Sequence, residues 1–207
     1  MIMSELEQIL KSASQNLDQF TPDKQREILD LVDQINDNKV KEKARKEFLP
    51  FVTAMWPGFI HGRHHTIMAE AFERVARGEL KRLIINMPPR HTKSEFASYL
   101  FPAWFLGMYP DKKVIQTAHT AELSVGFGRK VRNLIQNEDF QNVFPGIELS
   151  TDSKAAGRWN TNKRGDYFAI GVGGAVTGKG ADILIIDDPH SEQEATMGEY
   201  NPEVYNK

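Results

Sequence analysis

Apolar side chains recur at helical spacing in the first part of the chain, residues 1–47, which contains no glycine. Two sets each share one helical face: Leu6, Ile9 and Leu10, and then Ile28, Leu31, Val32 and Ile35. Thr21 and Pro22 mark the start of the second helix, because threonine is a good N-cap and proline fits the first helical position. That helix should end near residues 36–38. We predict a helical N-terminal appendage, which either docks a partner protein or covers its own domain.

Three further helices are predicted between residues 48 and 135. Their apolar sets are Met68, Ala71, Phe72 and Val75; Ala97, Leu100, Phe101 and Trp104; and Leu123, Phe127, Val131, Leu134 and Ile135. Gly78 closes the first helix, because glycine favours a left-handed cap. Pro102 should kink or limit the second helix, because it lacks a backbone donor.

Apolar runs between these helices predict strands. Residues 82–87, "RLIINM", and 113–119, "KVIQTAH", each precede a helix, and two short strands flank a turn at residues 162–165. A Gly-rich stretch leads into residues 183–190, "ILIIDDPH", whose continuous apolar run is typical of a parallel strand buried on both faces. The alternation predicts an α/β domain over residues 48–207, with a mostly parallel sheet flanked by helices.

Composition narrows the class of protein. The chain has 207 residues, 40% of them hydrophobic, which suffices for one sizeable core. Its formal net charge of -2 gives no overall basic field for a nucleic acid or a membrane. The lack of cysteine excludes disulfides and thiolate metal sites, and no apolar run approaches the ~18 residues of a membrane span. We therefore expect a cytoplasmic protein without a signal peptide.

The stretch "MPPRHTKSE", residues 87–95, lies between a predicted strand and a predicted helix. A phosphate-binding loop needs this context, because backbone N–H groups and the positive end of the helix then face the anion. The usual GxxxxGK(S/T) pattern is not met, since its glycine positions fall at Met87 and Thr92. In such a loop Lys93 would reach the β/γ phosphates, Ser94 would ligate Mg²⁺ and Arg90 would add a second cation.

Two carboxylates end the strand predicted at residues 183–187. In an ATP-hydrolysing site Asp187 would hold Mg²⁺ through water and Asp188 would orient the attacking water. Paired acids at a strand end are often only solvated loop residues. Together with the loop around Lys93, however, they predict a site for ATP and Mg²⁺.

Several stretches resemble motifs of one known family, and they occur in the same order along the chain as in that family. They are "LIINMPPRHTKSE", "FPAWFLGMYPDKKVI", "FGRKVRN", "GVGGAVTGKGADILIIDDP" and the "EA" at residues 194–195. Residues 48–207 thereby resemble the large terminase subunits of tailed bacteriophages. The resemblance implies a P-loop NTPase fold of the ASCE or RecA-like type and an ATPase that translocates double-stranded DNA into procapsids. It also implies a homo-oligomeric ring, a portal protein and a small terminase subunit as partners, no membrane, and the host cytoplasm as location.

The resemblance assigns roles to individual residues. Its nucleotide-binding residues would be Pro89, Arg90, His91, Thr92, Lys93 and Ser94. Ser94 and Asp187 would hold the metal. Asp188, Arg90 and Lys179 would be catalytic, with Lys179 in "TGKG" acting on the phosphates of a neighbouring subunit.

The chain departs from the family's usual pattern at four points. Thr92 stands where relatives usually have glycine, the acidic pair is Asp-Asp where many motors use Asp-Glu, and Lys179 stands where arginine is usual. The sequence also stops at Lys207, before the expected coupling strand and nuclease domain. We expect slow ATP hydrolysis and no nuclease activity from this fragment.

Other residues leave alternatives open. His61, His64 and His65 do not predict a metal site on their own, because ligands usually come from more than one segment. Residues 56–65 line a base pocket or form an ordinary packed loop. A basic set either tracks a DNA backbone or is solvated surface charge: Arg129, Arg132, Lys163 and Arg164.

Two other functions share the same motifs. A helicase-like, nucleic-acid-stimulated ATPase would use the same loop and the same acidic strand. A nucleotide-binding assembly module without hydrolysis would be consistent with Thr92 and with the short acidic side chain of Asp188.

Overall fold

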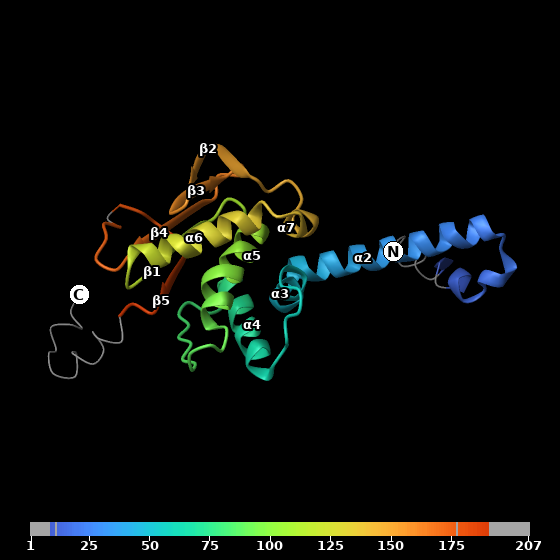
Figure 1. Ribbon diagram of the computed structural model, residues 1–207, viewed down its shortest axis with the longest axis horizontal. Helices are drawn as coiled ribbons and strands as arrows, with labels where there is room; N and C mark the ends of the chain where they lie inside the picture. Colours follow the sequence, from blue (N-terminus) through green and yellow to red (C-terminus); the bar gives the residue numbers. More distant parts are fainter. Residues whose placement is uncertain (1–8, 11, 177, 191–207) are drawn as a thin grey trace.

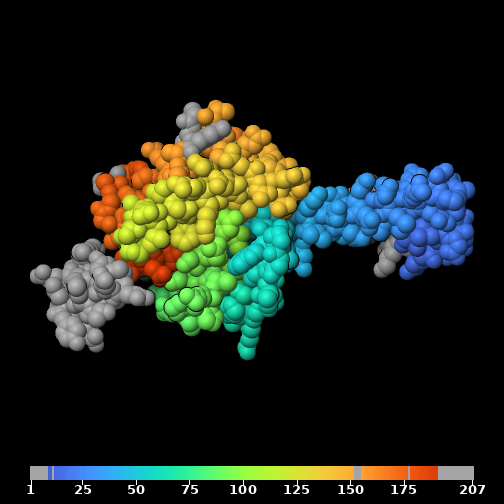
Figure 2. All heavy atoms as spheres, viewed as in Figure 1, coloured from blue at the N-terminus to red at the C-terminus, as the bar shows by residue number. Residues whose placement is uncertain are grey.

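A helical arm projects from an α/β body in the computed structural model, which describes residues 9–10, 12–176 and 178–190 (Figures 1 and 2). The arm consists of helical residues 9–10 and 12–15, a 3-10 turn η1 (Leu17–Gln19) and the long helix α2 (Pro22–Lys46). The side-chain amide of Gln25 joins the turn to α2 by donating to the carbonyls of Leu17 and Phe20, at 2.8 and 3.0 Å. Leu6 lies outside the described residues.

Helix α2 begins at Pro22 with Thr21 as N-cap, as predicted, but it continues to Lys46. The predicted end near residues 36–38 is therefore wrong. Lysine, glutamate and alanine, which are good helix formers, dominate the last turns, and an ion pair of 2.6 Å joins Glu42 to Lys46. Ala44 near the end of α2 is buried, so the helix enters the core there. The predicted domain boundary at residue 47 stays a prediction.

Aromatic rings form the core where the arm meets the body. Four helices meet there: α3 (Phe48–Met55), α4 (Arg63–Ala76), η2 (Glu95–Leu100, a π-helix) and α5 (Phe101–Met108). Phe48 is fully buried, and its ring lies 5.3–5.9 Å from the rings of Phe72, Phe96, Phe101 and Trp104. Such edge-to-face contacts add to the stabilisation from apolar burial.

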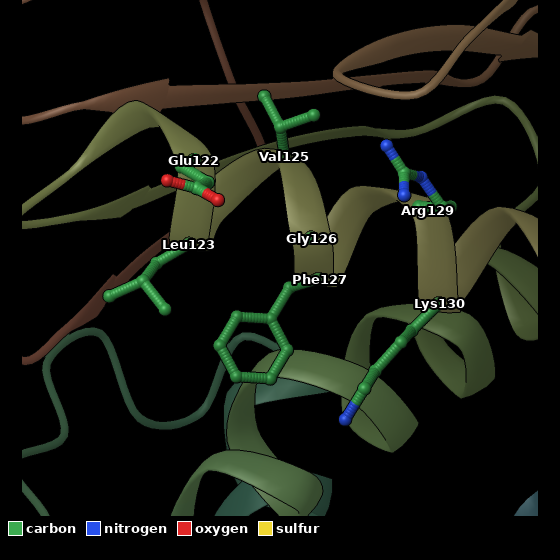
Figure 3. Close-up of a pocket in the computed structure, with 7 residues that line it drawn as sticks. All are labelled: Glu122, Leu123, Val125, Gly126, Phe127, Arg129 and Lys130. Atoms are coloured by element: carbon green, nitrogen blue, oxygen red, sulfur yellow. The ribbon is translucent and has the colours of Figure 1, made fainter.

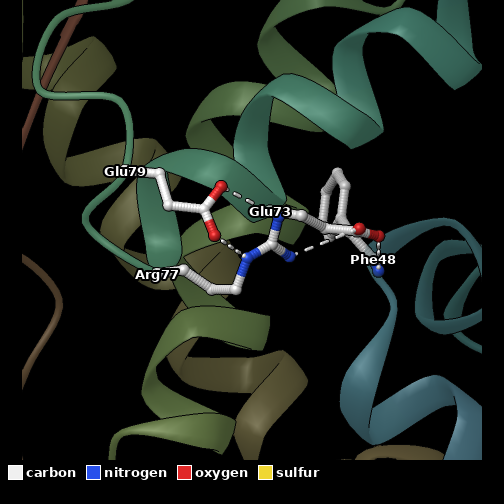
Figure 4. A network of polar contacts seen from close by, with 4 residues as sticks. All are labelled: Phe48, Glu73, Arg77 and Glu79. Carbon is white, nitrogen blue, oxygen red and sulfur yellow. Dashed lines mark hydrogen bonds and ion pairs between the residues drawn. The ribbon is translucent and has the colours of Figure 1, made fainter.

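A polar network fixes the start of α3 against α4 (Figure 4). The backbone N–H of Phe48 donates to the Glu73 carboxylate at 2.8 Å. Arg77 in turn lies 3.8 Å from Glu73 and 2.7 Å from Glu79. The carboxylate of Glu73 thereby satisfies a backbone donor that the helix start would leave unpaired. Gly78, with φ of 73°, follows α4 in the predicted left-handed conformation.

The sheet contains five strands in the order β2-β3-β4-β1-β5. They are β1 (Lys113–Ala118), β2 (Leu149–Ala155), β3 (Arg158–Thr161), β4 (Asp166–Gly171) and β5 (Ile183–Asp187). Strands β4, β1 and β5 run parallel, whereas β2, β3 and β4 pair antiparallel. The α/β class is confirmed, but the sheet is mixed and not mostly parallel. The short connections between β2, β3 and β4 require antiparallel neighbours.

Helix α6 (Ala121–Ile135) packs on β4 and β1, and α7 (Glu138–Val143) follows it. A Cβ added at Gly128 would lie 2.6 Å from the carbonyl oxygen of Ala156, so glycine permits this close approach. The Trp159 indole donates to the Gly128 carbonyl at 3.1 Å and stacks on Tyr167. Leu123 is exposed, so the apolar face of α6 is shifted by part of a turn from the predicted one.

Two predictions are wrong: the strand at residues 82–87, and the burial of the strand at residues 183–187 on both faces. Residues 83–87 form no strand and pair with none within the described chain, and Ile84 is 84% exposed. Strand β5 is the edge strand, and Leu184 and Ile186 are 60% and 58% exposed. A strand is buried on both faces only where other elements pack on each face, and the pattern of apolar residues alone does not show whether they do.

Among the helices that the structure describes, none is both long enough and apolar enough to span a membrane.

Candidate functional site

The loop at residues 88–92 joins residues 83–87 to the helix that carries Lys93 and Ser94 in its first turn. Arg90 and Thr92 have φ of 63° and 65°, which is uncommon for residues other than glycine. The N–H of Phe96 donates to the Thr92 carbonyl at 3.0 Å and closes the first helical turn. The N–H groups of Lys93 and Ser94 therefore belong to the set that no helical carbonyl can accept, which is the set that binds anions.

Lys93 brings this loop to the end of β5. Its ammonium lies 2.5 Å from Asp188 Oδ1 and 3.8 Å from Asp187 Oδ1, although Lys93 and Asp188 are 95 residues apart in the sequence. The Asp188 carbonyl accepts the N–H of His119 at 3.1 Å, which ties the acidic pair to the end of β1. The two motifs that the sequence analysis paired thus meet at the carboxyl ends of parallel strands.

A hydrogen bond from Ser98 orients Asp187. Ser98 Oγ donates to Asp187 Oδ2 at 2.8 Å, and both side chains are buried. Ser98 lies in the π-helix η2, a distortion that often marks functional sites. Ser98 was not predicted from the sequence, although its position four residues after Ser94, on the same helical face, was a usable signal.

The oxygen donors at this place suit Mg²⁺. Asp187 supplies a carboxylate and Ser94 a hydroxyl, both hard ligands of the kind that Mg²⁺ prefers. Among the described residues, no cluster of three or more His, Asp or Glu side chains could hold a metal alone.

Three of the predicted loop residues are exposed: Pro89, Arg90 and His91. His91 Nδ1 lies 2.9 Å from the Pro89 carbonyl, which is a contact within the loop. The Arg90 side chain is exposed beside it. Both residues are therefore accessible to a ligand that approaches Lys93.

Lys179 contacts a different face of the sheet. Its ammonium lies 3.1 Å from the centroid of the Phe168 ring, a cation–π contact. Tyr167 and Phe168 are consecutive residues of β4, so their side chains lie on opposite faces of the sheet. The strand register places Asp187 on the same face as Tyr167. Within one chain, Lys179 and Lys93 thus contact opposite faces.

The predicted basic residues divide between two places. Arg129 and Arg132 lie on α6, and Lys163 and Arg164 lie in the turn before β4. Register places this turn at the starting end of the parallel strands, because Lys113 pairs with Asp166, whereas Ala118 pairs with Asp187. The strand length of six residues separates the turn from the acidic pair by roughly 17 Å.

Residues 56–65 pack beside the loop. The Phe59 ring lies 4.7 Å from the His65 ring, and His65 stacks on Phe96 at 4.9 Å. His61 Nε2 lies 2.8 Å from Thr66 Oγ1. Burial, together with the charges of His64 and His61, lowers the pKa of His65 to about 4, so that its imidazole is neutral near pH 7. The segment contacts the core, and base binding by it stays a prediction.

A surface hollow of about 600 Å³ lies beside α6 (Figure 3). Its described lining consists of Glu122, Leu123, Val125, Gly126, Phe127, Arg129 and Lys130. All of these belong to one helix, so no second element provides an opposing wall within the described chain. Lys130 is also engaged, since it pairs with Glu95 at 2.8 Å. The contacts of Lys93 therefore identify the better candidate site.

A comparison of the chain with models of protein families, with curated proteins and with solved structures finds no match.

Proposed function

We propose that residues 88–94 and the end of β5 form one site that binds MgATP and hydrolyses it. The observation that carries the proposal is the contact of Lys93 with both Asp188 and Asp187, at 2.5 and 3.8 Å. A lysine at a helix start, free backbone N–H groups and two carboxylates at a strand end together satisfy what phosphoryl transfer requires.

Each side chain has a distinct role in this proposal. Lys93 binds the β/γ phosphates as a point charge, and Arg90 adds a second cation from the exposed loop. Asp187, oriented by Ser98, and Ser94 hold Mg²⁺. Mg²⁺ supplies charge neutralisation at the phosphates. Asp188, which is more exposed than Asp187, orients the attacking water.

The DNA-packaging part of the proposal rests on the sequence motifs. Their order resembles that of large terminase subunits, and the mixed α/β body is compatible with a P-loop ATPase domain of that kind. In this proposal the domain drives double-stranded DNA into procapsids in the host cytoplasm, as a ring that contacts a portal protein and a small terminase subunit. Lys179 lies on the face opposite Lys93, which fits a cation that acts on another subunit better than one that acts in its own.

Mg²⁺-dependent phosphate release from ATP tests the proposal. Asp187→Asn should weaken Mg²⁺ use, raising the Mg²⁺ concentration for half-maximal release at least tenfold. Asp182→Asn is the matched control, because Asp182 also pairs with a lysine, Lys112 at 3.0 Å, but lies before β5. Equal Mg²⁺ dependence in both variants would contradict the metal assignment.

The same assay separates the alternative functions. Tight ATP binding without any phosphate release would favour an assembly module. Release that accompanies duplex unwinding, without capsid components, would favour a helicase-like ATPase.

A further inference from the structure

His65 makes two hydrogen bonds that fix the position of its proton. Its Nδ1 accepts the N–H of Gly62 at 2.9 Å, so in the neutral ring the proton is on Nε2. Nε2 lies 2.8 Å from Thr92 Oγ1 and therefore donates to it. The Thr92 hydroxyl in turn donates to the His91 carbonyl at 2.5 Å. A chain of hydrogen bonds thus runs from α4 into the loop.

Thr92 needs such a partner because of its backbone conformation. Its φ of 65° lies in the left-handed region, which a β-branched residue adopts only at a cost of about 1 kcal/mol or more. A glycine would take this conformation freely. The next residue is Lys93, so a change in the backbone at Thr92 would redirect the lysine that contacts Asp188.

The His65 ring is itself immobilised. It is 4% exposed and lies between Phe96, on which it stacks, and the edge of Phe59. Phe96 belongs to the core and Phe59 packs against it, so the imidazole has little freedom to follow a moving loop. The donor on Nε2 is consequently a fixed point against which Thr92 can be held.

We infer that His65 is a positioning residue, which holds Thr92 in its left-handed conformation and so directs Lys93 toward the acidic pair. In ordinary phosphate loops glycine adopts such conformations without strain. Here the hydrogen bond from His65 stabilises the same kind of conformation at a threonine. The effect on nucleotide affinity rests on the proposed function, whereas the effect on loop conformation does not.

Limited trypsin digestion tests the conformational part, because Arg90 and Lys93 are cleavage positions within the loop. Thr92→Val keeps the shape of the side chain and removes the hydroxyl, and we expect cleavage after Arg90 to accelerate roughly fivefold to tenfold, the loss of one hydrogen bond. Thr92→Ser retains the hydroxyl and should retain the parent's cleavage rate. Equal rates for the two variants would overturn the inference.

A double-mutant cycle separates positioning from mere core packing. His65→Phe preserves the stacking but removes both the donor to Thr92 and the acceptor for the Gly62 N–H. It should therefore accelerate cleavage after Arg90 more in the parent than in the Thr92→Gly background. An equal acceleration in both backgrounds would contradict the inference. If His65→Phe does not fold, the Thr92 pair decides, together with the ¹⁵N signals of the His65 ring, which should show a proton on Nε2 in the parent. A proton on Nδ1 would also contradict it.

ATP kinetics distinguish this inference from the proposed function. If both hold, the KM for ATP of Thr92→Val should exceed that of Thr92→Ser roughly fivefold, with a smaller difference in kcat. A difference in cleavage without any ATP turnover would support the positioning role of His65 and count against the proposed function. ATP turnover with no difference in cleavage or KM between the two variants would support the proposed function and count against the positioning role of His65.

Discussion

The two halves of the candidate site are held in different ways. Asp187 belongs to the sheet, where β5 pairs with β1, and it is buried against Ser98. The loop half follows residues 83–87, which have no strand partner in the described chain. Its shape depends on side-chain contacts, His65 with Thr92 and Lys93 with Asp188. Backbone pairing fixes the acids, whereas a few hydrogen bonds and ion pairs fix the phosphate-binding side.

This difference predicts how each half responds to mutation. Substitutions of buried residues that contact Asp187 should alter the stability of the α/β body, because they disturb buried groups. Changes in the loop should alter ligand binding with little effect on stability, because the loop is exposed. Asp188 stands between these cases, since it follows β5 directly but is itself exposed.

Asp188→Asn should have the largest effect on the chemistry. Asparagine has nearly the same shape and tolerates the φ of 44° at this position. We expect ATP hydrolysis to fall by about 10²–10⁴-fold, the contribution of a positioned base, while MgATP binding and stability persist. Phosphate release and nucleotide titration measure the two quantities. Hydrolysis at the parent's rate would show that Asp188 does not orient the water.

Ser98→Ala and Ser94→Ala compare the two halves one helical turn apart. Ser98→Ala removes the donor to a buried carboxylate and should lower the free energy of unfolding by about 2–3 kcal/mol. Ser94→Ala should leave stability within about 0.5 kcal/mol and weaken Mg²⁺ binding instead. Urea denaturation and Mg²⁺ titration in the presence of ATP measure these effects. Equal stability of the two variants would remove the distinction between the halves.

Acid should destabilise the protein through His65. Its pKa of about 4 in the folded state lies below the value of about 6.5 expected for the unfolded chain, so the unfolded state binds more protons between these values. Stability therefore rises with pH across this window, and its His65 component is lower by about 2 kcal/mol at pH 5 than at pH 7.5.

Urea denaturation at the two pH values measures this loss of stability. His91→Asn, at an exposed position, should retain the acid sensitivity, and His65→Gln should lose much of it. An unchanged acid sensitivity in His65→Gln would show that another group is responsible.

The sequence predicted the parts of the site that depend on local pattern. The helix start after Thr92, the strand that ends at Asp187 and the helices around them follow from the spacing of apolar residues. It did not predict that residues 83–87 lack a strand partner or that Leu184 is exposed, because neighbouring strands decide both. The contacts of Ser98 and His65 were also missed, since each joins segments that are distant in the sequence.

Calorimetric titration of MgATP into the parent, Lys93→Ala and Lys112→Ala measures whether Lys93 binds the phosphates. Lys112 is the matched control, because it also pairs with an aspartate beside β5 but lies at the other end of the strands. If Lys93 holds the phosphates beside Asp187 and Asp188, the parent and Lys112→Ala bind MgATP alike, and Lys93→Ala binds at least 100-fold more weakly while remaining folded. Equal affinity of a folded Lys93→Ala variant, or no binding by the parent, would contradict the account.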